Sequence, residues 1–329
     1  MSSLMNDVSI VAAVQAAPVF LDLDRSVDKA CSLMGEAAKA GATLAVFPEA
    51  FLPGYPVWSW FIPPVKTHDL RPLYAELLEN SVDVPGRHVS RLCEAAADHG
   101  ITVSIGINER NHEASGSTLF NSLLHISDQG AILGCHRKMI PTVAERLVWG
   151  QGDGSDLQVH STPVGKVSGL ICWENYMPLA RYTLYARGME VCVAPTWDRG
   201  EPWISTMRHI GKEGRSFVIS ACSAMKMDDI PDRFEFKKKW MSEVGEWLNP
   251  GMSLIVDPDG KILAGPLEKE EGILLAEINL DFARGSRFQL DTAGHYARPD
   301  VFDLRIINES RSMLRAGLSP NEMAAPETQ

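Results

Sequence analysis

The chain has 329 residues, of which 45% are hydrophobic and 22% are charged, a composition typical of a globular protein and unlike that of disordered or fibrous chains. Thirty-one Lys and Arg against 42 Asp and Glu give a net charge of −11 with no basic block, so we expect no nucleic-acid partner. The six cysteines show no CxxC pair and no zinc-ligand spacing, which predicts reduced thiols and argues against a disulfide scaffold.

Two segments are candidates for a membrane span or a secretory signal, and neither has the required pattern. Residues 44–65 are the most apolar stretch, but five prolines and Glu49 interrupt the continuous helix that a membrane span requires. The first residues lack a positively charged region and include Asp7, which is unlike a secretory signal. We therefore expect a cytoplasmic protein without membrane attachment.

Strand and helix patterns alternate along the first two-thirds of the chain. Apolar runs predict strands at 8–14, 43–47, 101–107, 166–171, 190–195 and 217–223. Apolar residues at helical spacing predict helices over 25–40, over 89–99 before Gly100, over 178–187 and over 203–215. Turn residues at 128–130 and 258–260 predict two antiparallel hairpins, and a last strand follows at 272–280.

Interleaved strands and helices with late hairpins predict an α/β fold with a mixed sheet. No linker, repeat or low-complexity tract divides the chain. We expect one domain over residues 8–281 and a C-terminal extension over 282–329, whose end at 318–329 has a composition typical of disorder.

Three predicted strands run into polar segments that contain Glu49, Cys172 and Thr196-Trp197-Asp198. Ligands tend to bind at the carboxyl ends of strands in α/β sheets. A helix N-terminus and a cation near Cys172 could lower the pKa of its thiol, although a cysteine that closes an apolar strand is often structural. Glu49 lies in a long uncharged segment, so its carboxylate needs a partner and its raised pKa would suit a general base; a structural ion pair is the alternative.

Lys138 and Glu145 are ambiguous by themselves. Lys138 follows His136 and Arg137 at the end of a predicted hairpin strand, and such a run is commonly a cationic surface cluster. Glu145, seven residues later, could be a helix-capping or solvent-facing acid.

Together, three segments resemble the nitrilase (carbon–nitrogen hydrolase) superfamily. FPEAFLPGYP is similar to the family's glutamate segment, HRKMIPTVAERLVWGQGDG to its lysine segment, and GLICWENYMPLARY to its nucleophile segment, in the family's order and spacing. Three further features resemble the nitrilase branch: the Trp-Glu-Asn that follows the cysteine, the VWGQGDG run and the late DTAGHYARPD segment. The resemblance implies a four-layer αββα sandwich and homo-oligomers built from dimers, including spirals or filaments.

The resemblance also implies roles for four residues. Cys172 would be the nucleophile, Glu49 the general base, Lys138 the cation and Glu145 a second acid that orients Lys138 or shuttles protons. An organic nitrile would be hydrolysed to a carboxylic acid and ammonia through a thioimidate and a thioester on Cys172. Lys138 and the backbone N–H of Trp173 would stabilise the nitrogen that gains charge.

This chemistry requires no metal and no organic cofactor. The nine histidines form no HExxH pattern, GxSxG is absent, and the GQGDG glycines do not sit between a strand and a helix as a dinucleotide loop would. The other five cysteines lie on apolar faces and are interpreted as packing residues, with Cys135 the nearest rival of Cys172.

Aromatic residues near Glu49 and Cys172 suggest the substrate. Tyr55, Trp173 and Trp197 are the candidates for the walls of an apolar pocket that accepts an aromatic or arylaliphatic nitrile. Aromatic clusters also fill cores and subunit contacts, which is the competing interpretation, and applies more strongly to Trp58, Trp60 and Phe61.

Three alternatives remain at this stage. The same residues could act on cyanide, as in a cyanide dihydratase or hydratase, or on amides. A cysteine–histidine hydrolase would pair Cys172 with His136 or His209. A filament-forming scaffold without catalytic turnover is the non-enzymatic alternative.

Overall fold

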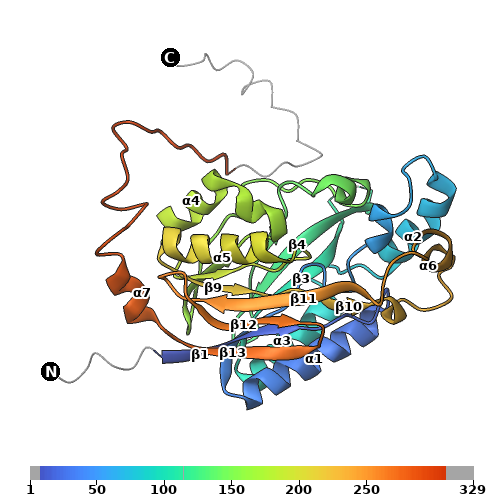
Figure 1. Cartoon of the computed structure of the whole chain (residues 1–329), viewed down its shortest axis with the longest axis horizontal. Coiled ribbons are helices and arrows are strands. Elements are labelled where there is room, and N and C mark those ends of the chain that lie inside the picture. Colours follow the sequence, from blue (N-terminus) through green and yellow to red (C-terminus); the bar gives the residue numbers. More distant parts are fainter. Residues whose placement is uncertain (1–7, 114, 309–329) are drawn as a thin grey trace, which may run out of the picture.

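The computed structural model describes residues 8–113 and 115–308, and its central feature is a pair of mixed β-sheets with helices on both outer faces (Figure 1). Within these residues every helix is too short or too polar to span a bilayer. The expected α/β class and the αββα order of layers are both confirmed.

The first sheet has the strand order β13-β1-β2-β3-β4-β5. β1, β2 and β3 are parallel to one another. The outer strands pair antiparallel with their neighbours: β13 with β1, β4 with β3, and β5 with β4. The bounds are β1 Val8–Gln15, β2 Ala42–Val46, β3 Thr102–Asn111, β4 Thr118–Ile126, β5 Ile132–Arg137 and β13 Gly272–Asn279. The expected β4–β5 hairpin is confirmed.

The second sheet repeats this plan, because three parallel strands, β7, β8 and β9, again form its centre. Its order is β10-β11-β9-β8-β7-β6, with β12 paired to β11. The bounds are β6 His160–Thr162, β7 Gly165–Gly169, β8 Val191–Val193, β9 Phe217–Ser220, β10 Ala224–Lys226, β11 Trp247–Val256 and β12 Ile262–Glu268. The short strands β6 and β10 were not expected from the sequence.

The four predicted helices are confirmed. Asp22 caps the first by accepting a hydrogen bond from the Arg25 backbone, and Gly100 ends the second in the left-handed conformation that glycine adopts without strain. The α-helices are α1 Leu23–Lys39, α2 Thr67–Glu79, α3 Arg87–His99, α4 Pro178–Ala186, α5 Glu201–Gly214, α6 Glu235–Trp240 and α7 Leu280–Ser286. Short 3-10 helices are η1 Val57–Trp60, η2 Val143–Leu147, η3 Cys172–Tyr176 and η4 Met227–Asp229.

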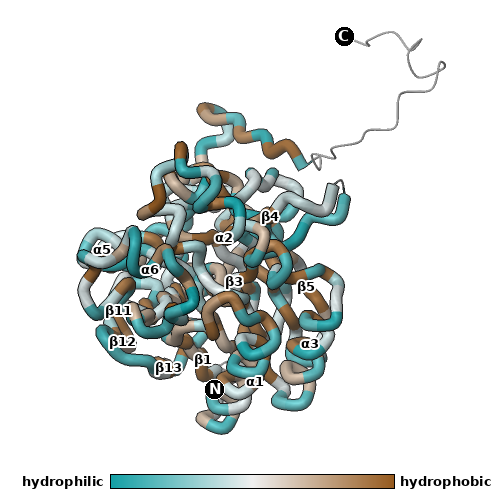
Figure 2. The backbone as a smooth tube through the Cα atoms, turned by 90° about the vertical axis from the view of Figure 1, so that its right-hand side faces the viewer, coloured by the Kyte–Doolittle hydropathy of each residue, from teal (hydrophilic) through white to brown (hydrophobic). Residues whose placement is uncertain are grey.

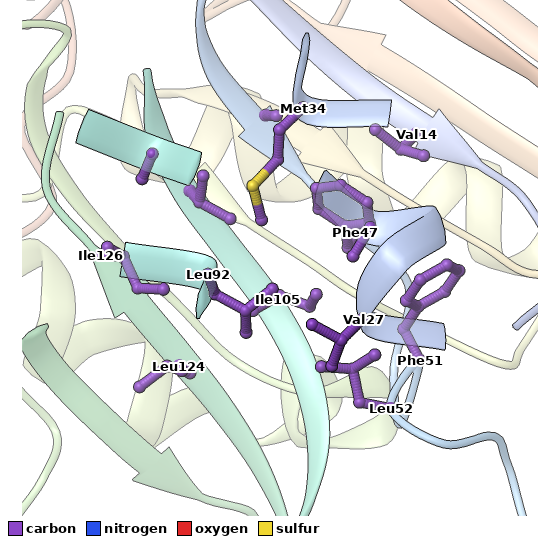
Figure 3. Packing of buried hydrophobic residues seen from close by; sticks show 14 of the residues in the cluster. Val14, Val27, Met34, Phe47, Phe51, Leu52, Leu92, Ile105, Leu124 and Ile126 are labelled. Atoms are coloured by element: carbon purple, nitrogen blue, oxygen red, sulfur yellow. The ribbon is translucent and has the colours of Figure 1, made fainter. Parts of the chain in front are cut away.

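Three apolar interfaces hold the four layers together. The first packs α1 and α3 on the outer face of the first sheet, where Met34 and Leu92 meet Phe47 and Ile105 (Figure 3). The second fills the space between the two sheets, and the third packs α4 and α5 on the outer face of the second sheet. Brown hydrophobic residues accordingly follow the strands in Figure 2, while teal residues mark the outer sides of the helices.

A separate aromatic cluster covers one end of the sandwich. It joins η1, α2 and α6, with Phe20 edge-on to Trp58 and to Phe234, and α2 and α6 lie side by side (Figure 1). Neither helix was expected from the sequence, because α2 contains Pro72 and buries only Leu73 and Leu77, and α6 is six residues long. We call this cluster the aromatic cap. Tertiary packing stabilises its helices more than a periodic apolar pattern does.

After β13 of the first sheet, the chain continues through α7 into a segment without helix or strand as far as residue 308. The boundary proposed at 281/282 remains a prediction. The expected disorder at 318–329 falls outside the described residues.

Candidate active site

Glu49 lies in the turn that follows β2, at the carboxyl end of the parallel strands. Its carboxylate is 1% exposed and accepts hydrogen bonds from the Asn121 side chain at 2.7 Å, the Trp197 backbone N–H at 2.8 Å and Lys138 Nζ at 2.7 Å. Gly106 on β3 permits this turn, since a Cβ there would lie 2.3 Å from the Pro48 carbonyl oxygen. The charge is thus fully enclosed by donors, as the uncharged sequence around it predicts.

Lys138 follows the last residue of β5 and is completely buried. Its ammonium group donates to Glu49 and to Glu145 Oε2, each at 2.7 Å, and its backbone N–H donates to the Asn121 carbonyl. The interpretation of this segment as a surface cationic cluster is therefore wrong for Lys138 and for the buried His136.

Glu145 both caps a short helix and contacts Lys138. One oxygen accepts the backbone N–H of Thr142 at 2.6 Å, which caps η2, and the same oxygen accepts the Lys138 ammonium. The other oxygen accepts the Tyr55 hydroxyl at 2.7 Å. The acid is 1% exposed, so the interpretation of it as solvent-facing is wrong.

Cys172 is the first residue of η3, at a sharp turn that follows β7. Its φ is +51°, a left-handed conformation that is costly for a residue with a Cβ, and the Cys172 N–H to Pro195 carbonyl hydrogen bond of 2.8 Å fixes it. The Thr196 hydroxyl donates to Sγ at 3.3 Å. Strain of this kind is typical of residues that a fold presents for chemistry.

The pKa values in this cluster follow from burial. Burial raises the pKa of Glu49, which Lys138 partly offsets and Glu145 reinforces. Burial would lower the pKa of Lys138, but Glu49 and Glu145 raise it above its usual value, so the amine stays charged. Burial raises the pKa of Cys172 as well, helped by Glu49 and opposed by Lys138. The expected lowering of the thiol pKa is wrong, because desolvation outweighs the cation.

A cavity of about 360 Å³ opens beside this cluster. Cys172, Glu145 and Thr142 form its polar side. Its remaining walls are mainly aromatic and aliphatic and consist of Tyr55, Val57, Trp60, Phe61, Trp173, Trp197, Val244, Trp247 and Leu248. Two charged residues, Asp198 and Arg199, also line it.

All three predicted wall residues line the cavity. Tyr55 and Trp197 stack with ring centroids 4.4 Å apart, and Trp173 Nε1 donates to Asp198 at 2.9 Å. Trp60 and Phe61 also reach the cavity wall, whereas Trp58 packs in the aromatic cap.

Sequence reasoning assigned no role to Asn121, Thr142 or Thr196, whose polar groups complete the cluster. A signal existed only for Thr196, which follows a predicted strand. Asn121 lies inside β4 between Phe120 and Ser122, and nothing in this local sequence indicates that it faces a carboxylate.

The cysteine–histidine alternative does not fit the geometry. Both ring nitrogens of His136 are taken by carboxylates, Asp156 at 2.7 Å and Glu174 at 3.0 Å, and His209 is an exposed residue of α5 near Glu213. Cys135 contacts Glu109, and burial holds the pKa of its thiol well above its usual range.

No group of three or more metal-ligating side chains occurs within the part of the chain that the structure describes. The polar cluster beside the cavity holds a thiol, two carboxylates and an ammonium group, and such a set can support attack on an unsaturated carbon–nitrogen group.

Comparison with known proteins identifies similar sequences and a shared fold. The chain is 42% identical over 303 residues to an aliphatic nitrilase of Sinorhizobium fredii (strain HH103), covering 92% of this chain and 96% of the relative. It is 40% identical over 298 residues to nitrilase 2 of Arabidopsis thaliana, covering 89% and 87%. The C. elegans NitFhit protein shares the fold with a TM-score of 0.68 at 19% identity, over 91% of this chain and 67% of that one. The family model described as carbon–nitrogen hydrolase matches residues 10–288, and the chain therefore belongs to the carbon–nitrogen hydrolase family, the nitrilase superfamily.

Proposed function

We propose that this enzyme is a nitrilase that converts an organic nitrile to its carboxylic acid and ammonia. The observation that carries the proposal is the buried ammonium of Lys138 between Glu49 and Glu145, beside a cavity that Glu145 and Cys172 line. Membership of the carbon–nitrogen hydrolase family and the relatives named nitrilases support the same activity.

The first step is attack of the Cys172 sulfur on the nitrile carbon. The resting thiol is protonated, because burial raises its pKa, so a base must remove the proton as the S–C bond forms. Glu49 is the proposed base, since its own raised pKa makes it a better proton acceptor than an exposed carboxylate. The proton passes to the nitrile nitrogen, which gives a thioimidate.

The nitrogen gains negative charge during this attack and needs donors. Lys138 remains charged and can supply one N–H, and Trp173 can supply its backbone N–H from the first turn of η3, where such groups have no intrahelical partner. Glu145 holds the ammonium in place through its 2.7 Å contact.

Two waters complete the reaction. The first, activated by Glu49, adds to the thioimidate carbon, and ammonia leaves from the tetrahedral species to give a thioester. The second cleaves the thioester, which releases the acid and restores the thiol. If sulfur leaves the tetrahedral species before ammonia, an amide is the product, and a small amide fraction is expected.

The walls of the cavity favour an aromatic or arylaliphatic substrate. Tyr55 and Trp197 form a stacked pair beside the catalytic cluster, and Trp173 closes another side. Flat, apolar walls accept a ring by offset or edge-on contacts and gain from its burial.

Cyanide and amides are the alternative substrates for the same residues. The test is a panel of benzonitrile, phenylacetonitrile, propionitrile, cyanide, benzamide and propionamide, with ammonia measured for each. We expect ammonia from nitriles with the highest kcat/KM for the aromatic pair, and none from the Cys172→Ala control. Ammonia from amides alone would exclude the nitrilase proposal, and a preference for propionitrile would overturn only the aromatic preference.

No cofactor is part of the scheme. A cytoplasmic location and a homo-oligomer of dimers, with the chain after residue 281 contributing to subunit contacts, complete the proposal. Particle size of the full chain compared with a truncation after Leu280 tests the last point, and an unchanged size would contradict it.

A further inference from the structure

A buried carboxylate lies directly beside the proposed machinery and has no step in the mechanism. Glu174, two residues after Cys172, has a fully buried side chain. One oxygen accepts the backbone N–H of Met139 at 2.7 Å and the other accepts the backbone N–H of Ile171 at 2.8 Å. A single side chain thus joins the residue after Lys138 to the residue before Cys172.

His136 extends this connection on the other side. Its Nε2 lies 3.0 Å from Glu174, and its Nδ1 lies 2.7 Å from Asp156. Asp156 in turn accepts the backbone N–H of Arg137 at 2.9 Å through its second oxygen. Burial would lower the pKa of His136, but the two carboxylates raise it to about 10, so the ring is an imidazolium that donates to both.

The result is a continuous chain of charges, Asp156–His136–Glu174, in which His136 and Glu174 are buried and Asp156 is partly exposed. This chain bonds to the backbone on both sides of Lys138. Its anchors are the N–H groups of Arg137 and Met139, and its far end holds Ile171. Hydrogen bonds from backbone N–H groups to a carboxylate are short and directional, so they allow the bonded backbone little movement. The two strand ends that carry the cation and the sulfur belong to different sheets, β5 and β7, and this chain crosses between them.

We propose that Glu174, together with His136 and Asp156, is a positioning device that fixes the Lys138 ammonium relative to the Cys172 sulfur. The inference rests on the proposed function, in which these two groups act on one nitrile. Misplacement of a reacting group by about 1 Å can cost on the order of 100-fold in rate. Lys138 and Cys172 follow strands of different sheets, so their relative position depends on a contact that joins the two sheets.

Glu174→Gln is the direct test, because the amide keeps the shape of the side chain but offers only one acceptor oxygen. Either the Met139 or the Ile171 N–H then faces an NH₂ group and loses its partner. We expect kcat on the best nitrile to fall about 100-fold with KM changed less than about 3-fold, each rate normalised to titratable Cys172. Glu213→Gln is the matched control, since Glu213 is a partly buried carboxylate held by Arg181 and Tyr185 outside the cavity, and its kcat should not change.

A second measurement does not depend on nitrile hydrolysis. Lys138 favours the Cys172 thiolate, so a displaced ammonium should slow alkylation of Cys172 by iodoacetamide at pH 8, several-fold in Glu174→Gln relative to Glu213→Gln. Asp156→Asn, which leaves the Glu174 contacts in place, should show a smaller change in the same direction.

The outcomes separate the two proposals. A folded Glu174→Gln variant with unchanged kcat and unchanged alkylation would overturn the positioning role. If Glu174→Gln and Asp156→Asn both aggregate while Glu213→Gln folds, the three linked charges serve fold stability alone. That result would also overturn the positioning role. Absence of ammonia from every nitrile with the unaltered enzyme would defeat the proposed function, and the alkylation rates would still decide the positioning role.

Discussion

Replacing Lys138 by Met tests whether the three charges behave as one coupled cluster. The substitution keeps the length and volume of the side chain and removes the ammonium that lies 2.7 Å from both Glu49 and Glu145. Two carboxylates are then left in a buried site without a cation. Removal of one partner from a buried ion pair costs roughly 3–5 kcal/mol.

The hydrogen bonds that survive place the expected loss near the lower limit. Glu49 keeps its donors from Asn121 and the Trp197 backbone, and Glu145 keeps those from Tyr55 and the Thr142 backbone. We therefore expect the free energy of unfolding to fall by about 3 kcal/mol at pH 8.

The loss should depend on pH, with a sign set by Glu49. Burial already raises its folded-state pKa, and Lys138 is the main group that lowers it, so the variant raises this pKa further. A group whose folded pKa exceeds its unfolded pKa stabilises the fold at low pH and loses that contribution as pH rises through the folded value. The difference between the two proteins should therefore be largest at pH 8 and shrink towards pH 5.

Urea unfolding followed by fluorescence at pH 5, 6.5 and 8 measures this difference. Lys226→Met is the control, because the exposed Lys226 side chain makes surface contacts with Glu246 and the Trp247 ring, and its loss should change stability little at any of the three pH values. The double variant Lys138→Met/Glu145→Gln should regain part of the stability at pH 8 while remaining inactive. A loss for Lys138→Met below about 1 kcal/mol, or one independent of pH, would refute the coupled cluster.

Three further substitutions probe the surroundings. Tyr55→Phe removes the hydroxyl that Glu145 accepts, and should lower kcat about 10-fold with little change in thermal stability; equal kcat would show that the hydroxyl is dispensable. Gly106→Ala places a methyl group 2.8 Å from the Glu49 Cα and should cut activity at least 10-fold, as measured by ammonia release, whereas an active variant would mean that the turn can shift freely. Trp203→Ala empties the interface beneath α5 and should cost about 3–5 kcal/mol in urea unfolding without changing KM; a loss under about 1 kcal/mol would contradict the packing.

The sequence by itself determined the regular part of this protein. Apolar runs and helical spacing located β1, α1, β2, α3, the β4–β5 hairpin and the strand–helix units of the second sheet, because the central strands are mostly buried and each helix buries one face against an apolar layer. The resemblance of three long motifs to the carbon–nitrogen hydrolase family located Glu49, Lys138 and Cys172, and Glu49 and Cys172 also stand where a predicted strand gives way to polar residues. The cap helices α2 and α6 escaped because neither has a strong apolar stripe.

Only the tertiary structure decided the electrostatics of the site. Whether Lys138 is a surface cation or a buried one depends on acids 89 residues before it and 7 after it, and no local pattern encodes that distance. The sign of the Cys172 pKa shift depends on the balance between desolvation and the charges of Glu49 and Lys138, which only the packed site sets. Local spacing predicts secondary structure because it reflects contacts within a few residues, whereas a buried charge is governed by whatever the folded chain brings within a few ångströms of it.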